Sequence, residues 1–172
     1  MSLFSPTYST TATAMSQTSQ LLPREFATRA TVRVLIVDDE PHVLAVGKAV
    51  LEAHCFETLA ARTGEEAVAL VRHGLETGES VTVAILDLTM PGGASGFEVL
   101  EWLRACDPAL PVIACSGYFQ EDVRELCQAI GFVDVLHKPF NLETLGVSVR
   151  RAMAQGNEAA AYGTSYSVEA AS

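Results

Sequence analysis

The sequence predicts an α/β fold: a doubly wound, five-stranded parallel sheet between two layers of helices, with the strand order 2-1-3-4-5. Two observations carry this prediction. Short apolar runs without polar alternation, typical of strands buried on both faces, recur along the chain. Between these runs, apolar residues recur at the spacing of an amphipathic helix. Because strand-helix-strand crossovers are right-handed, such units form a three-layer sandwich.

The first two units follow each other closely. The first strand covers residues 32–37, and Pro41 after it suits the first turn of a helix. The second strand covers residues 56–60. Gly64 precedes its helix, and Gly78 marks the end of that helix.

The third strand, at residues 81–87, is an almost wholly apolar run that ends on a carboxylate. A loop rich in glycine covers residues 91–96 and leads into a helix that Pro108 closes. The fourth strand follows at residues 110–115. Acidic residues open the next helix.

The last unit begins after Gly131, a natural residue for the end of the fourth helix. The fifth strand covers residues 132–136, and Asn141 is a good N-cap for the last helix. Apolar residues continue at helical spacing to about Met153.

Tails are expected on both sides of a single domain at residues 31–154. Residues 1–30 are rich in Ser, Thr and Ala without any period, so we expect them to be disordered. An organelle transit peptide and a start at Met15 are alternative explanations of this segment. Residues 155–172 are expected to form a flexible tail.

Composition excludes several classes of partner. The formal charge of −10 and the lack of a basic cluster argue against direct binding of nucleic acid. No apolar run approaches the roughly 20 residues that span a membrane. The four cysteines lack metal-ligand spacing, which favours free thiols in a reducing, cytoplasmic setting.

Polar residues follow four of the predicted strands where each strand ends. They are Asp38 and Asp39, Asp87, Ser116 and Lys138. Because the carboxyl ends of parallel strands meet at one edge of a sheet, we expect these side chains to form a site.

Three carboxylates at one edge need a counter-charge. At a separation of roughly 5 Å and an effective dielectric of about 20, each pair repels by on the order of 3 kcal/mol. Lys138 and a divalent cation are the two candidates, and an open, all-oxygen site suits Mg²⁺ better than zinc. A carboxylate such as Asp87 can also act as a nucleophile and accept a phosphoryl group.

The candidate residues occur in an ordered set of short motifs, which are Asp38-Asp39, Asp87 followed by Met90-Pro91, Ser116-Gly117-Tyr118 and Lys138-Pro139-Phe140. This set resembles the receiver domain of bacterial-type response regulators over about residues 32–153. The resemblance implies that Asp87 accepts a phosphoryl group from a phosphohistidine on a sensor histidine kinase or a histidine phosphotransfer protein.

The resemblance also implies roles for single residues. Asp39 and Asp87 would bind Mg²⁺ directly, Asp38 through water and Thr89 through its backbone carbonyl. Ser116 and Lys138 would contact the phosphoryl group as switch residues, and the bond before Pro139 would be cis. Thr89 and Tyr118 would tune the lifetime of the phosphoryl group.

The signal would leave through the surface of the fourth helix, fifth strand and fifth helix, where a downstream protein would bind, with no nucleic acid or membrane partner. Two features depart from the common pattern of the family. Val135 stands where the family has an aromatic residue. The loop at residues 92–96 is one residue longer. The motif Ser116-Gly117-Tyr118 is similar to receivers attached to hybrid sensor kinases.

We therefore expect a stand-alone receiver without an output domain. It would not be an enzyme beyond Mg²⁺-dependent self-phosphorylation and slow self-dephosphorylation. Alternatives are the terminal receiver of a hybrid sensor kinase and a non-phosphorylated interaction module of the same fold. A phosphohydrolase with an Asp nucleophile is disfavoured, because Thr89 stands where its Asp-x-Asp motif needs a second acid.

Overall fold

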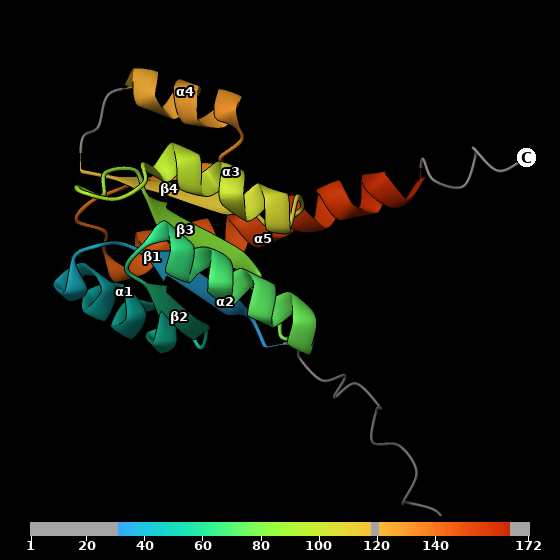
Figure 1. The fold of residues 1–172 in the computed structure, drawn as a ribbon, viewed down its shortest axis with the longest axis horizontal. Helices are drawn as coiled ribbons and strands as arrows, with labels where there is room; N and C mark the ends of the chain where they lie inside the picture. The colour runs from blue at the N-terminus through green and yellow to red at the C-terminus, as the bar shows by residue number, and fades with distance from the viewer. Residues whose placement is uncertain (1–30, 118–120, 166–172) are drawn as a thin grey trace, which may run out of the picture. The chain divides into compact units, whose positions relative to one another are not determined.

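The computed structural model of the protein describes residues 31–117 and 121–165. Its five strands are parallel and follow the order β2-β1-β3-β4-β5 (Figure 1), which confirms the predicted fold class. The strands are β1 (Arg33–Val37), β2 (Glu57–Ala61), β3 (Val83–Asp87), β4 (Val112–Ser116) and β5 (Asp134–His137). The helices that alternate with them are α1 (Pro41–Ala53), α2 (Gly64–Thr77), α3 (Gly96–Cys106), α4 (Glu121–Ile130) and α5 (Leu142–Ser165).

Both faces of the sheet are buried, because successive side chains of each strand point to opposite helical layers. On β1, Leu35 and Val37 belong to the core cluster that includes side chains of α2 and α3. Val34 and Ile36 belong to the cluster formed with α1 and α5. The unbroken apolar runs in the sequence therefore reflect burial on two sides.

The sheet register brings several strand ends to one edge. Strand β3 lies between β1 and β4, and Asp87 at its end pairs with Cys115. Ser116 ends β4 and pairs with His137, so Lys138 follows β5 at the same edge. Residues far apart in the sequence are placed together in this way.

The first residue of helix α3, Gly96, lies against the backbone at the end of β3. The Ser95 hydroxyl accepts a hydrogen bond from the Glu98 backbone N–H, and the Glu98 carboxylate accepts one from the Ser95 backbone N–H at 2.9 Å. Hydrogen bonds from the backbone N–H and the hydroxyl of Ser95 to the Glu98 carboxylate lower the pKa of Glu98. A Cβ on Gly96 would lie 2.5 Å from the backbone oxygen of Asp87, so only glycine allows this close approach.

Several boundaries differ from those expected; the fifth strand, for example, covers Asp134–His137 and not residues 132–136. Strand β4 begins at Val112 and not at residue 110, because Pro111 has no N–H to donate to a neighbouring strand. The third strand is likewise shorter and begins at Val83. Helix α5 continues to Ser165, where a tail was expected from residue 155, because the sequence there is rich in alanine, the strongest helix former.

Residues 1–30, which were expected to be disordered, lie outside the described residues. Residues 166–172, the end of the expected C-terminal tail, also lie outside them. Within the described part of the chain, none of the helices combines the length and the hydropathy needed to cross a bilayer.

Candidate functional site

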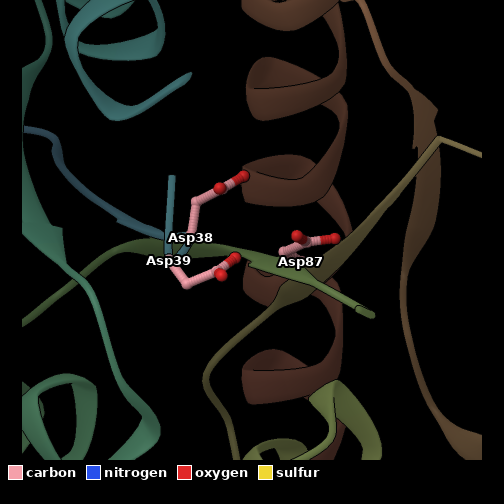
Figure 2. Close-up of side chains that lie close together, drawn as sticks. All are labelled: Asp38, Asp39 and Asp87. Atoms are coloured by element: carbon pink, nitrogen blue, oxygen red, sulfur yellow. The ribbon is translucent and has the colours of Figure 1, made fainter. Parts of the chain in front are cut away.

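Three carboxylates lie together at the carboxyl ends of β1 and β3. Asp38 and Asp39 directly follow β1, and Asp87 is the last residue of β3 (Figure 2). One carboxylate oxygen from each lies within 4.8 Å of the others. Asp38 and Asp87 are buried, whereas Asp39 is half-buried. The structure thus brings together the acidic residues that the sequence analysis selected.

Lys138 supplies a positive charge to this cluster. Its Nζ lies 2.5 Å from Asp38 Oδ2 and 2.8 Å from Asp87 Oδ2. The backbone N–H of Lys138 donates to the Ser116 carbonyl at 2.9 Å, and the bond between Lys138 and Pro139 is cis. One ammonium group therefore bridges two of the three carboxylates.

Backbone groups hold the other oxygens of the same two carboxylates. The N–H of Glu40 donates to Asp38 Oδ1 at 3.0 Å, and the N–H of Thr89 donates to Asp87 Oδ1 at 3.1 Å. In both cases, the donor lies two residues after the acid, as in an Asx turn. Each buried carboxylate is thus oriented by one backbone N–H and by Lys138.

Burial and hydrogen bonding act in opposite directions on the charges of the site. Burial raises the pKa of Asp87, although hydrogen bonds from Lys138 and the Thr89 N–H oppose this effect. Burial alone would lower the pKa of Lys138, but its hydrogen bonds with Asp38 and Asp87 outweigh burial and raise that pKa. Lys138 is therefore a cation at neutral pH, next to a carboxylate that is costly to ionise.

Cys115 on β4 is the register partner of Asp87 on β3. It is buried in the apolar cluster on the α1 and α5 side of the sheet. Burial raises the pKa of its thiol to about 12, so the thiol is protonated at neutral pH. Cys115 therefore acts as a small apolar residue here and not as a nucleophile.

The other predicted site residues occupy different positions around the cluster. Ser116 ends β4 and is buried, and Thr89, two residues after the end of β3, is exposed. Tyr118 lies outside the described residues, so its predicted role is not examined by the structure. Sequence reasoning missed the backbone donors of Glu40 and Thr89, although an acid followed by a turn is a recognisable signal for such contacts.

A hollow of about 440 Å³ opens beside Asp39. It is lined by residues of the β2–α2 junction, among them Arg62 and Glu66, and by the loop from Met90 to Ala94. The Arg62 side chain donates to the Asp39 carbonyl at 3.4 Å, a contact that sequence reasoning also missed. Asp39 is therefore accessible to a ligand from this side.

The donor set fits a hard divalent cation. All three clustered groups offer carboxylate oxygens, and the half-buried Asp39 leaves the cluster accessible. Mg²⁺ prefers such oxygen ligands and retains water in its shell, whereas zinc favours nitrogen and sulfur. Asp38, Asp39 and Asp87 are thus suitable ligands for Mg²⁺.

Comparison with known proteins agrees with this geometry. The family model described as the response regulator receiver domain matches residues 34–150. The chain belongs to this family. The receiver is 35% identical over 124 residues to the protein PilH of Pseudomonas aeruginosa, and the match covers 71% of this chain and 98% of PilH.

Two further matches show how receivers occur in different contexts. A cyclic di-GMP phosphodiesterase of Thermotoga maritima is 32% identical over 120 residues, which cover 70% of this chain but only 30% of that protein. The crystal structure of a CheY-like receiver domain protein from Methanospirillum hungatei JF-1 matches with a TM-score of 0.64 and 25% identity, covering 74% of this chain and 98% of that one. The chain thus spans less than a third of the phosphodiesterase and nearly all of the CheY-like protein.

Replacing Lys138 with Met is expected to destabilise the receiver when no divalent cation is present. Asp38 and Asp87 would then be buried without their shared cation, and removing one partner of a buried ion pair costs about 3 kcal/mol. We expect the free energy of unfolding in urea at pH 7 with EDTA to fall by about that amount, and Mg²⁺ to restore part of it.

The matched control is Lys48→Met. Lys48 forms an exposed pair with Glu52 at 3.7 Å, and such pairs contribute about 0.5 kcal/mol or less. Equal losses in the two variants would show that the bridge at Lys138 does not stabilise the fold.

Proposed function

We propose that this receiver accepts a phosphoryl group on Asp87 in an Mg²⁺-dependent reaction, with a phosphohistidine as the physiological donor. The contact of Asp87 with Lys138 at 2.8 Å, inside a cluster of three carboxylates, is the observation that carries the proposal. It combines a nucleophile, a cation for the incoming phosphoryl group and a set of oxygen ligands in one place.

The proposed chemistry is a single phosphoryl transfer. A carboxylate oxygen of Asp87 forms a bond to phosphorus, the bond from phosphorus to the donor nitrogen breaks, and the leaving imidazole takes up a proton. The ammonium group of Lys138 pairs with the carboxylate before the transfer and with the phosphoryl oxygens after it. Ser116, at the end of β4, is placed at the same edge and is proposed to donate its hydroxyl to a phosphoryl oxygen.

Mg²⁺ would neutralise charge on the phosphoryl oxygens when it is bound. Asp38, Asp39 and Asp87 and the backbone carbonyl of Thr89 are the proposed ligands. Thr89 is exposed beside Asp87 and, together with Tyr118, is proposed to control how readily water reaches the acyl phosphate.

The proposed donors are a sensor histidine kinase or a histidine phosphotransfer protein, and the proposed output is a downstream protein that binds the face formed by α4, β5 and α5. We propose that the receiver works without an attached output domain. The match over 98% of PilH supports this proposal. The motif at Ser116 to Tyr118 favours the terminal receiver of a hybrid sensor kinase as the second candidate.

The test is the intact mass of the protein after incubation with acetyl phosphate. One added phosphoryl group is expected with Mg²⁺ and none with EDTA. The product should be lost in hydroxylamine, which cleaves an acyl phosphate but leaves a phosphoserine intact. No addition with Mg²⁺ would contradict the proposal and favour a non-phosphorylated interaction module of the same fold.

A further inference from the structure

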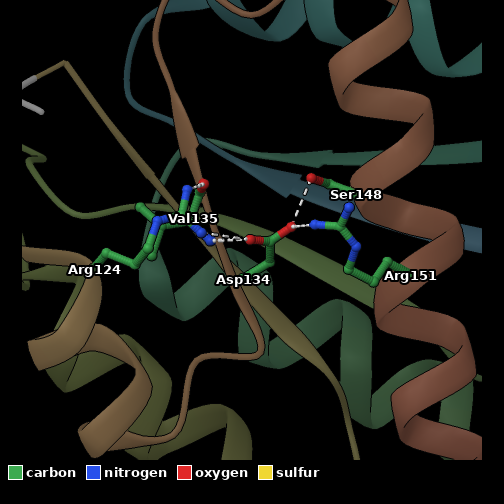
Figure 3. Close-up of polar contacts among 5 residues, drawn as sticks. All are labelled: Arg124, Asp134, Val135, Ser148 and Arg151. Atoms are coloured by element: carbon green, nitrogen blue, oxygen red, sulfur yellow. Dashed lines mark hydrogen bonds and ion pairs between the residues drawn. The ribbon is translucent and has the colours of Figure 1, made fainter. Parts of the chain in front are cut away.

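One buried carboxylate outside the site joins three elements of the fold. Asp134 at the start of β5 is 5% exposed, and both of its oxygens accept hydrogen bonds (Figure 3). Oδ1 accepts from Arg124 Nη1 on α4 at 3.2 Å and from the Val135 backbone N–H at 2.8 Å. Oδ2 accepts from the Ser148 hydroxyl at 2.8 Å and from Arg151 Nη1 at 3.5 Å, both on α5.

Two nitrogens of the Arg124 guanidinium group donate hydrogen bonds to β5. While Nη1 contacts Asp134, Nη2 donates to the backbone carbonyl of Val135 at 3.2 Å. Strand β5 is an edge strand of the sheet, so this contact attaches α4 directly to the edge. The planar guanidinium group, a fork of two donors, binds a carboxylate and a carbonyl at once. It therefore fixes the orientation of α4 as well as its distance from β5.

Only part of the apolar surface of α4 packs against the core. Among its described side chains, Cys127 is fully buried and Val123 packs partly buried against the core, whereas Leu126 and Ile130 are 52% and 43% exposed. The end of α4 is tied to α3, because Arg104 Nη2 donates to the Gly131 carbonyl at 2.5 Å. Gly131 has a φ of 114°, a conformation that favours glycine. The helix is thus fixed at its end and held along its length by the fork of Arg124.

Both partners of the fork connect to the phosphoacceptor edge. Strand β5 runs from Asp134 to His137, and Lys138 follows directly. The segment that leads into α4 starts at the other edge residue, Ser116. Val135 is 6% exposed and packs in the core, where the family resemblance implied an aromatic switch residue. The two residues of the phosphoacceptor edge, Ser116 and Lys138, are therefore linked along the chain to the two elements that the contact between Arg124 and Asp134 joins.

We propose that the contact of Arg124 with Asp134 and Val135 is a latch that holds α4 in the unphosphorylated arrangement, and that its release favours phosphorylation of Asp87. The proposal rests on the proposed function and adds a regulatory element to it. If phosphorylation loosens the latch, opening the latch favours the phosphorylated state in free energy, because coupling between two sites is reciprocal.

The experiment compares the wild type with Arg124→Gln. Phosphorylation by acetyl phosphate and Mg²⁺ is followed by intact mass at a donor concentration that phosphorylates only part of the wild type. Hydrogen exchange of the α4 amides is measured without donor. We expect the phosphorylated-to-unphosphorylated ratio to rise on the order of five-fold, and α4 to exchange faster.

Arg151→Gln is the matched control. It removes the same kind of charge from the same carboxylate, at a longer distance of 3.5 Å and from α5, so α4 stays attached. This variant should resemble the wild type in both measurements. Arg124→Lys, which keeps the charge but loses the fork, should fall between the wild type and Arg124→Gln and serves if the latter variant is poorly folded.

The outcomes separate the latch from the proposed function. A wild type without phosphorylation would overturn both proposals. Phosphorylation of the wild type with an unchanged or lower ratio in Arg124→Gln would overturn the latch alone. An equal rise in Arg124→Gln and Arg151→Gln would also overturn the latch, because it would point to net charge and not to the attachment of α4.

Discussion

Replacing Asp87 with Asn is expected to abolish phosphorylation of the receiver by acetyl phosphate. The amide has the size of the carboxylate but lacks a nucleophilic oxygen, so no acyl phosphate can form. The loss should be complete within detection by intact mass, under conditions in which the wild type gains one phosphoryl group.

Unfolding does not explain the expected loss. Burial raises the pKa of Asp87, so the stability from its protonated form is present below the unfolded pKa and lost as pH rises through the folded pKa. A neutral Asn avoids the cost of burying the charge of Asp87, and Lys138 keeps its contact with Asp38. We therefore expect Asp87→Asn to unfold at a temperature no lower than the wild type.

The control for Asp87→Asn is Asp39→Asn. Asp39 belongs to the same cluster but contributes a metal ligand in the proposal and not the nucleophile. Asp39→Asn should still become phosphorylated, at a lower rate and with a higher requirement for Mg²⁺. Persistent phosphorylation of Asp87→Asn would move the acceptor to another side chain and contradict the proposed function.

Replacing Gly96 with Ala is expected to reduce both stability and phosphorylation. The new Cβ would lie 2.5 Å from the Asp87 carbonyl oxygen and 2.8 Å from Leu88 Cα, which are backbone atoms that cannot rotate away. Overpacking of this kind costs about 1–3 kcal/mol, although alanine favours a helix more than glycine does. Because the contact falls on Asp87 itself, the rate of phosphorylation should fall along with the free energy of unfolding.

Gly93→Ala is the matched control within the same loop. A Cβ on Gly93 would lie 3.9 Å from the Met90 carbonyl oxygen, an ordinary contact. We expect urea unfolding and phosphorylation of this variant to match the wild type. If Gly96→Ala behaved like Gly93→Ala, the close approach of α3 to β3 would not position the acceptor.

The order of the elements could be predicted because local patterns determine it. Burial on both faces produces unbroken apolar runs, and Pro41 marks a helix start that the structure has at that residue. The ends were less predictable. Pro111 shortened β4 through its missing N–H. The helix propensity of alanine extended α5 to Ser165, beyond Met153, where the apolar pattern predicted its end.

The carboxylate cluster could also be predicted, because a parallel sheet gathers the ends of its strands at one edge. Lys138 and Asp87 are 51 residues apart, yet their contact follows from this rule. No such rule brings Arg124 of α4 to Asp134, or Ser148 of α5 to the same carboxylate. Those contacts depend on how two helices pack against an edge strand, and the sequence pattern does not specify that distance.

The bridge formed by Lys138 means that the acidic edge carries its own counter-ion. The ammonium group already contacts Asp38 Oδ2 and Asp87 Oδ2, two of the three groups that a metal ion would use. A divalent cation at these carboxylates would therefore compete with Lys138 for their negative charge or share it. That competition would lower the apparent affinity of the edge for the metal.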